Sequence, residues 1–256
     1  MSRVRALARK ESGDAFRSPV AYAVAAFFLL LSGFFFRNHA TFYHLLSIRR
    51  GAAGAAPVDL RITPGILQPL YESISFLLIL IVPLLTMRLL AEEKRNRSFE
   101  LLLAYPVKIG EAVVGKFLGA FFFYVLLLLP TLAYPVFLAR VAEVDPGAVA
   151  GAYLGLLLLG GAYLALGLFV SSLTESPIVA AAGTYGALLL AWTVGYAATL
   201  ASPPVSQVME RLSFLHRFGR FTVGLVDTGD VVFFIAWIVI ALAGTDRVLR
   251  SRRWRG

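Results

Sequence analysis

The sequence predicts an all-α integral membrane protein with six transmembrane helices, folded as a single membrane domain over residues 1–256. Hydrophobic residues make up 59% of the chain and its mean hydropathy is +0.77. A soluble fold cannot hide that much apolar surface from water, whereas lipid can. Six apolar stretches are each long enough to cross a hydrocarbon core of about 30 Å as a helix. These spans are expected at residues 19–36, 70–91, 112–139, 148–170, 178–200 and 229–246.

The basic residues predict the orientation of the six spans. Sixteen of the 24 Lys and Arg residues lie in the N-terminal segment, in the polar segment after the second span with its flank, and in the C-terminal tail. An even number of spans puts both termini on one side, and the positive-inside rule assigns that side to the cytoplasm. We therefore expect a multi-pass protein of the bacterial cytoplasmic (inner) membrane, in contact with the lipid bilayer. Because topology explains the net charge of +9, no nucleic-acid partner is expected.

The N-terminal residues 1–18 combine basic side chains with apolar ones such as Val4, Leu7 and Phe16. They fit a helix that lies in the cytoplasmic interface, and a solvated basic tail is the alternative. The first span is expected to be retained rather than cleaved. Its apolar stretch is longer than a signal-peptide core, and it ends at Phe36 and Arg37 without a small-residue cleavage site.

Two segments are expected on the outer side of the membrane. Residues 37–69 are predicted to form a long connection with a flexible piece at 51–57, and no chemistry is assigned to it. Residues 202–230 are semi-polar with periodic large apolar residues, which predicts short helices at the outer interface. All three histidines fall in these outer segments, and metal binding by the pair five residues apart is disfavoured. They are His39, His44 and His216.

Proline and glycine inside the spans predict local geometry. Pro83 is expected to kink the second span, and Pro130 and Pro135 the third. Gly151 and Gly155 are four residues apart, which allows a neighbouring helix to approach closely. Packing within the subunit is favoured over a dimer seam for this pair, because such spacings arise easily in a chain with 22 glycines.

A short polar segment interrupts the apolar pattern between the second and third spans. From Arg88 to Glu100 it carries seven charged side chains, and burying them at the bilayer centre would cost on the order of 20 kcal/mol. The segment must therefore lie in water. Glu93 and Arg97 are spaced i, i+4, which favours a helix that continues out of the second span. Asn96 and the nearby Ser98 can end that helix and start another.

A second short helix is predicted to begin at Ser98. Glu100 would lie in its first turn, where the helix dipole favours a negative charge, and the helix should end before Pro106. Residues 101–103 are leucines and would form an apolar ridge. Such a helix suits a groove on a partner protein. The ridge could equally pack back on the membrane domain, and the residues alone leave both interpretations open.

Several functions are disfavoured by what the sequence lacks. It contains no phosphate-binding loop, no HExxH and no GxSxG motif. The sequence therefore lacks the motifs for nucleotide hydrolysis and for the commoner hydrolase reactions. It contains no cysteine, which excludes thiolate chemistry and Cys-based metal sites. No charged residue lies well inside a predicted span, which disfavours an ion-coupled secondary carrier. We therefore expect no enzyme activity, no catalytic residue, no metal and no cofactor in this chain.

Four segments of the chain form a pattern when taken in order. The first is Lys10-Glu11 with Ser18-Pro19-Val20-Ala21-Tyr22; the second is Glu92-Glu93-Lys94-Arg95 with Ser98, Glu100-Leu101-Leu102, Pro106-Val107 and Gly115-Lys116-Phe117; the third runs from Gly167 to Glu175; the fourth holds Phe218, Phe221, Gly224, Asp227 and Asp230. Together they resemble the permease subunits of ABC-2-type transporters, particularly the gliding-motility-type branch.

The resemblance implies a type V exporter-like permease fold with a short cytoplasmic coupling helix. It implies a subunit that dimerises, with a second copy or a related permease, to form a translocation path. A separate cytoplasmic ABC ATPase subunit would hold the ATP and Mg and drive it, and a protein with an outer-side domain is a further candidate partner. The ATPase-coupling residues would be Glu92, Glu93, Arg97, Ser98, Glu100, Leu101, Leu102 and Pro106, with a secondary cytoplasmic contact at Ser172, Thr174 and Glu175.

Two alternative functions stay open at this point. One is a non-transporting membrane scaffold, or mechanical subunit, of an ATPase-driven envelope or motility complex. The other, less favoured, is the ion-coupled secondary carrier. The substrate and the direction of transport are not predicted.

Overall fold

The computed structural model of the chain describes residues 13, 19–52, 62–96, 109–198, 200, 202 and 205–253. Across these residues the chain is a bundle of helices, and six helical units are long and apolar enough to cross a membrane by length and composition. The all-α prediction with six spans is therefore confirmed. The predicted interfacial helix at 1–18 and the predicted coupling helix from Ser98 to Pro106 lie outside the described residues, apart from Gly13.

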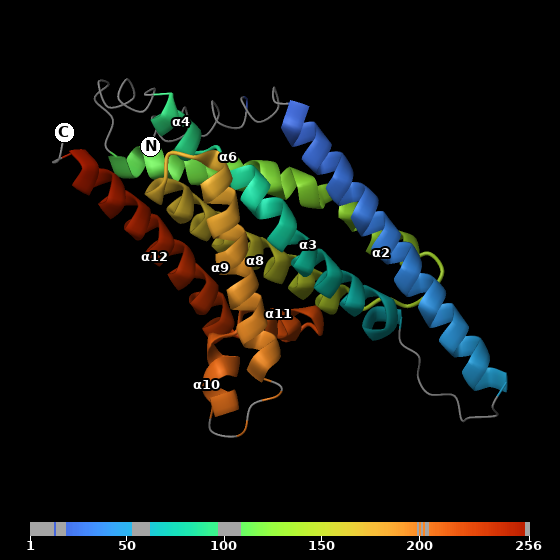
Figure 1. Cartoon of the computed structure of the whole chain (residues 1–256). Coiled ribbons are helices and arrows are strands. Elements are labelled where there is room, and N and C mark those ends of the chain that lie inside the picture. Colours follow the sequence, from blue (N-terminus) through green and yellow to red (C-terminus); the bar gives the residue numbers. More distant parts are fainter. Residues whose placement is uncertain are drawn as a thin grey trace.

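The helices run between two ends of the molecule (Figure 1). One end, the α4 end, holds α4, the start of α2 and the end of α12; the other, the α10 end, holds α10 and α11. The elements are α2 (Pro19–Ala52), a π-helical turn η1 (Thr63–Leu67), α3 (Gln68–Thr86), α4 (Ala91–Arg95), α6 (Ile109–Leu128), a 3₁₀ turn η2 (Leu129–Leu132), α7 (Ala133–Leu138), α8 (Pro146–Leu173), α9 (Pro177–Ala198), α10 (Val205–Leu212), α11 (Phe214–Thr222) and α12 (Thr228–Arg253).

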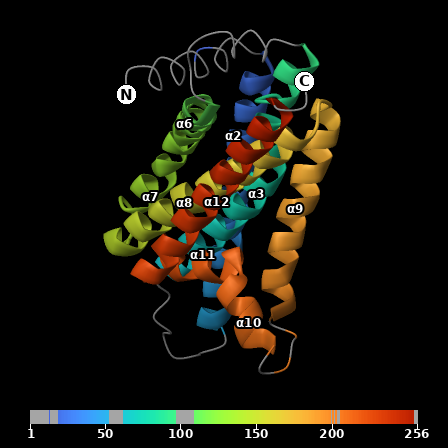
Figure 2. The ribbon, with the colours of Figure 1, turned by 90° about the vertical axis from the view of Figure 1, so that its left-hand side faces the viewer.

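Helix α8 lies at the centre of the bundle and packs against α3, α6, α9, α11 and α12. Figure 2 shows α6 and α9 on either side of the α8 and α12 pair. The sequence of α8 explains this position, because its small residues let large side chains of its neighbours approach the backbone. A Cβ added at Gly155 would lie 2.7 Å from Phe221, and one added at Gly151 would lie 2.9 Å from the Phe221 carbonyl. The prediction that this glycine pair serves packing within the subunit is confirmed.

The first helix is longer than predicted. It runs from Pro19 to Ala52 instead of ending at residue 36, because Arg37 and Asn38 do not break a helix and no Gly or Pro follows them before Gly51. At 1.5 Å per residue it is about 50 Å long, so part of it extends beyond the hydrocarbon core. His39 and His44 therefore lie on α2 and not in a loop, and His39 Nε2 forms a 2.9 Å hydrogen bond with Ser73 Oγ of α3.

The second and third spans are interrupted. Helix α3 ends at Thr86, and a turn at residues 87–90 separates it from α4, so the second span does not continue as one helix into the polar segment as predicted. Asn96 caps the end of α4, as expected. In the third span the helix tightens into a 3₁₀ turn that contains Pro130, which removes a backbone donor there. Pro83 lies inside α3 and Pro135 inside α7. The kinks expected at the three prolines stay predictions.

Two short helices, α10 and α11, form most of the segment between the fifth and sixth spans, as predicted. Ser213 begins α11, because its Oγ accepts a 3.0 Å hydrogen bond from the main-chain N–H of His216. Phe218 and Phe221 of α11 are fully buried. Helix α11 therefore belongs to the core of the bundle at the α10 end, where it packs on α8.

Candidate coupling site at the α4 end

Helix α4 is held in place by the end of α8. Its N-cap residue Leu90 makes no side-chain cap, and a helix start leaves main-chain N–H groups without partners inside the helix. Ser171 of α8 supplies the missing acceptor: its Oγ accepts hydrogen bonds from the N–H groups of Leu90 (3.3 Å) and Ala91 (3.1 Å) and donates one to the Met87 carbonyl (3.4 Å). Ser171, Leu90 and Ala91 are all buried. The position of α4 therefore depends on that of α8.

A second bond ties α4 to the turn between α8 and α9. Lys94 Nζ donates a hydrogen bond to the main-chain carbonyl of Ser172, in the last turn of α8, where carbonyl groups lack partners inside the helix. Thr174 then ends α8 in an extended conformation, and its Oγ1 accepts a 3.2 Å bond from the Ser176 N–H. Helix α4 contacts both α8 and α9. Helix α4 and this turn, predicted as separate contacts, thus lie against each other.

An ion pair joins α4 to α6. Lys116 Nζ lies 2.6 Å from Glu93 Oε1, and the Lys116 side chain is only 2% exposed. The Glu93 side chain is 24% exposed, so only the Lys116 member of the pair is fully buried. Removing Glu93 would take a charge-assisted hydrogen bond from a buried ammonium, at a cost of about 1.5–3 kcal/mol. Lys116 was expected as a charge flanking the polar segment, at the start of the predicted third span. The structure buries its side chain on α6, whose start lies toward the α4 end (Figure 1).

The remaining predicted site residues separate into three groups. Glu92 is half-exposed and pairs loosely with Arg88, at 3.7 Å, a type of surface pair worth less than about 1 kcal/mol. Ser172 is buried, Thr174 is half-buried and Glu175 is exposed on the α8–α9 turn. The others lie outside the described residues: Arg97, Ser98, Glu100, Leu101, Leu102 and Pro106.

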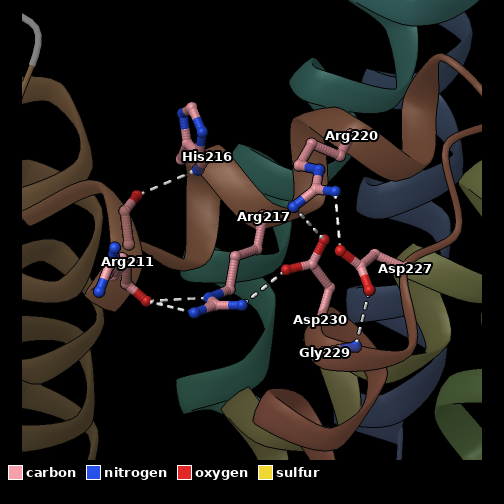
Figure 3. Close-up of polar contacts among 8 residues, drawn as sticks. Arg211, His216, Arg217, Arg220, Asp227, Gly229 and Asp230 are labelled. Carbon is pink, nitrogen blue, oxygen red and sulfur yellow. Dashed lines mark hydrogen bonds and ion pairs between the residues drawn. The ribbon is translucent and has the colours of Figure 1, made fainter. Parts of the chain in front are cut away.

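The α10 end contains an ionic cluster made by Arg217, Arg220, Asp227 and Asp230 (Figure 3). Asp230 is 1% exposed and receives two guanidinium groups: Arg217 Nη1 at 2.6 Å and Arg220 Nη1 at 3.2 Å. Arg220 also pairs with Asp227 at 2.9 Å. The cluster borders a polar pocket of about 290 Å³, which is also lined by Gln207, Glu210, Arg211 and His216.

Arg217 connects three helices at this end. Its guanidinium donates two hydrogen bonds to the Arg211 carbonyl at the end of α10, at 2.9 and 2.7 Å, and one to Asp230 of α12. The same group lies 4.2 Å from the ring centroid of Phe233, in cation–π geometry. The planar, multi-donor guanidinium is what allows one side chain of α11 to hold both neighbours.

Asp227 precedes α12, and its side chain is about half-exposed. Its pKa lies below the ordinary value, first because its carboxylate accepts a hydrogen bond from the Gly229 N–H and then because Arg220 donates to it. Asp227 and Asp230 were named from the sequence only as part of a resemblance, and their arginine partners were not predicted. The sequence does contain a signal for these ion pairs. The arginines precede the aspartates by 7 to 13 residues in a semi-polar segment, and this segment must fold back on itself between two spans.

These features define a multi-pass helical membrane protein whose ion pairs, among the described residues, lie near its two ends. Residues 63–244 match the family model described as ABC-2 family transporter protein. The chain therefore belongs to the ABC-2 transporter family, and it is a permease subunit. The matched region runs from the start of the second span into the last and includes both the candidate coupling site and the ionic cluster.

A relative supports the same assignment. The chain is 34% identical, over 113 residues, to a protein of Pseudomonas aeruginosa named probable ABC transporter permease protein NosY. The aligned part is 44% of this chain and 37% of that protein, so the chain spans little more than a third of the relative's length. The predicted ABC-2 permease is confirmed. The gliding-motility-type branch stays a prediction.

Proposed function

We propose that this permease subunit pairs with a second copy or a related permease, forms a translocation path between them, and is driven by a separate cytoplasmic ABC ATPase subunit. ATP and Mg would bind on that partner. This chain would transmit movement and perform no chemistry. The α4 end would face the cytoplasm of a bacterial inner membrane, because the basic residues concentrate in the segments that belong to that side.

The observation that supports this proposal most is the attachment of α4. A five-residue helix has no stability of its own, yet here it is bonded to the end of α8 through Ser171 and Lys94 and to α6 through Glu93. Residues 97–108, where the sequence predicts the docking helix, follow directly. A load applied to that segment would therefore reach two spans, which is what a coupling site requires.

The test is co-purification of an ATPase with the tagged chain from its native membranes. We expect Leu101→Asp and Glu100→Lys to leave the protein in the membrane and to lower the co-purified, permease-stimulated ATP hydrolysis at least tenfold. Leu212→Asp, at an exposed position of α10, and Glu143→Lys, at an exposed position before α8, make the same chemical changes at the other end. If the first two variants retained full ATPase binding and activity, the docking assignment would be wrong.

The secondary contact can be tested in the same assay. Glu175 is exposed on the α8–α9 turn, beside α4. If the ATPase also touches this turn, Glu175→Lys should weaken its binding by less than the Glu100 variant does, because the turn is the lesser contact. Equal binding by the wild type and Glu175→Lys would remove this turn from the interface.

The scaffold alternative predicts the same ATPase binding but no transport. Reconstituting the chain with its ATPase in proteoliposomes separates the two, because only a permease moves material across the bilayer. A secondary carrier would instead work without ATP. An outer-side protein partner stays a prediction, and it would be sought by cross-linking at the α10 end.

A further inference from the structure

We propose that the ion pair between Glu93 and the buried Lys116 is a clamp that makes α4 move as one rigid unit with α6 and α8. This inference rests on the proposed function, since it says how the push of an ATPase passes into the membrane domain. It changes the assigned role of Glu93. The sequence analysis placed Glu93 in the contact with the ATPase, whereas here it is a positioning residue inside the permease.

The two members of the ion pair lie on either side of residues 97–108 in the sequence. Glu93 lies on α4, just before residues 97–108, and Lys116 lies in the second turn of α6, just after them. The 2.6 Å contact between Glu93 and Lys116 therefore joins α4 and α6, the two helices that flank the segment predicted to dock the partner. Without this contact, a push on that segment would separate α4 from α6. With it, the two helices must move together.

Helix α4 is also attached to α8. Ser171 binds the start of α4 through two main-chain N–H groups, and Lys94, the neighbour of Glu93, binds the carbonyl of Ser172. Closing the clamp thus joins α6 to α8 through α4. These two spans also pack directly against each other deeper in the bundle. Displacement of the segment would then be delivered to two neighbouring spans at once.

Burial distinguishes this pair from the other ion pairs at the α4 end. Arg88–Glu92 and Arg250–Asp246 each lie within one helical stretch, and their basic side chains are 50% and 61% exposed. Lys116 is 2% exposed and its partner is on another element. An apolar pair of similar volume usually stabilises a fold as well as a buried ion pair does. Geometric specificity, the one thing that an apolar contact lacks, is therefore what the pair contributes.

The experiment measures docking and movement separately. The natural chain has no cysteine, so cysteines at Phe137 of α7 and Val232 of α12, which are 59% and 63% exposed, can carry two spin labels uniquely. The labelled permease is purified with its ATPase, and the distance between the labels is measured without nucleotide and with ATP and vanadate. Wild type should bind the ATPase and show a nucleotide-dependent change in this distance.

The decisive variant is the double substitution Glu93→Leu with Lys116→Met. It keeps the volume and removes both charges, so folding should be retained, as checked by thermal unfolding and gel filtration. We expect ATPase binding to persist and the nucleotide-dependent distance change to fall by at least half. Lys116→Arg and the charge swap Glu93→Lys with Lys116→Glu should restore the change, because each keeps a charge pair between α4 and α6. Arg250→Gln, the matched control, should leave it intact.

The outcomes separate this inference from the proposed function. If the wild type binds no ATPase, the proposed function fails. If the wild type binds the ATPase and the apolar double variant shows the same nucleotide-dependent change in label distance, the clamp is overturned while the proposed function stands. If the apolar variant does not fold, the charge swap Glu93→Lys with Lys116→Glu decides. A distance change in the charge swap no larger than in Glu93→Lys alone also overturns the clamp.

Discussion

Among the described residues, Lys116 is buried at the α4 end and Asp230 at the α10 end, and the two charges are held in different ways. At the α10 end, Asp230 is held by Arg217 and Arg220, which are 13 and 10 residues away in the sequence. At the α4 end, Lys116 meets a residue 23 positions away, and Ser171 reaches main-chain groups 80 and 81 positions away. The contacts around Asp230 at the α10 end join residues that are close in the sequence. The contacts at the α4 end form only when α4, α6 and α8 are packed together.

The difference teaches where movement can enter the molecule. Local contacts form whenever a short segment folds, so the α10 end should hold its shape through a conformational change. Long-range contacts report the relative positions of spans, so the α4 end should respond to any shift of α6 or α8. The following predictions test this contrast, from the largest expected effect to the smallest.

Glu93→Ala should destabilise the protein most, by about 1.5–3 kcal/mol, because it removes a charge-assisted hydrogen bond from the buried Lys116 ammonium. Asp230→Ala should cost less, since Arg217 and Arg220 are 20% and 41% exposed and can turn to water. Thermal unfolding in one detergent measures both. A larger loss for Asp230→Ala would reverse the contrast between the two ends.

Ser171→Ala should cost about 1–3 kcal/mol, because the buried N–H groups of Leu90 and Ala91 lose their acceptor. Protease cleavage or hydrogen exchange within α4 should accelerate, while exchange in α10 and α11 stays unchanged. Ser47→Ala is the matched control, since that hydroxyl is exposed and bonds only within its own helix. Unchanged exchange in α4 would show that the cap does not hold this helix.

Arg217→Lys should have a smaller effect, of about 1 kcal/mol. Lysine keeps the charge near Asp230 but loses the paired bonds to the Arg211 carbonyl and part of the contact with Phe233. Exchange should therefore accelerate in α10 and leave α4 unaffected. Faster exchange at both ends would show that the ends are coupled more tightly than their contacts indicate.

The smallest effect concerns Asp227 and pH. Its pKa is lowered in the folded protein by the Gly229 N–H and by Arg220. The stabilisation is therefore fully present above the pKa of the unfolded chain and is lost as the pH falls below about 4, through the folded value. The melting temperatures of wild type and Asp227→Asn should differ at pH 7 and converge towards pH 3. A difference that grows on acidification would contradict this assignment.

The sequence predicted the spans better than the connections between them. Hydropathy located all six spans, and periodic large residues located α10 and α11. It missed the extension of α2 to Ala52, because a polar pair such as Arg37 and Asn38 ends an apolar run without ending a helix. It also predicted one continuous helix from the second span into the polar segment, whereas a turn at residues 87–90 divides it.

The sequence predicted individual residues of the candidate site but not the contacts that bring them together. Glu93 and the turn from Ser172 to Glu175 were both named, but as independent contacts with a partner. Their connection depends on Lys116, whose position five residues into an apolar stretch indicated a flanking charge and not a buried one. Nothing in the order of residues along the chain specifies that α4 lies against the end of α8.

The class of this protein, its six spans and the place of its charged segments follow from the sequence, because transfer of a contiguous stretch into lipid depends on that stretch alone. The partner of Lys116 and the cap of α4 follow only from the tertiary structure. Glu93 is 23 residues from Lys116, and Ser171 is 80 and 81 residues from the N–H groups that it binds, so these contacts require α4, α6 and α8 to be packed together.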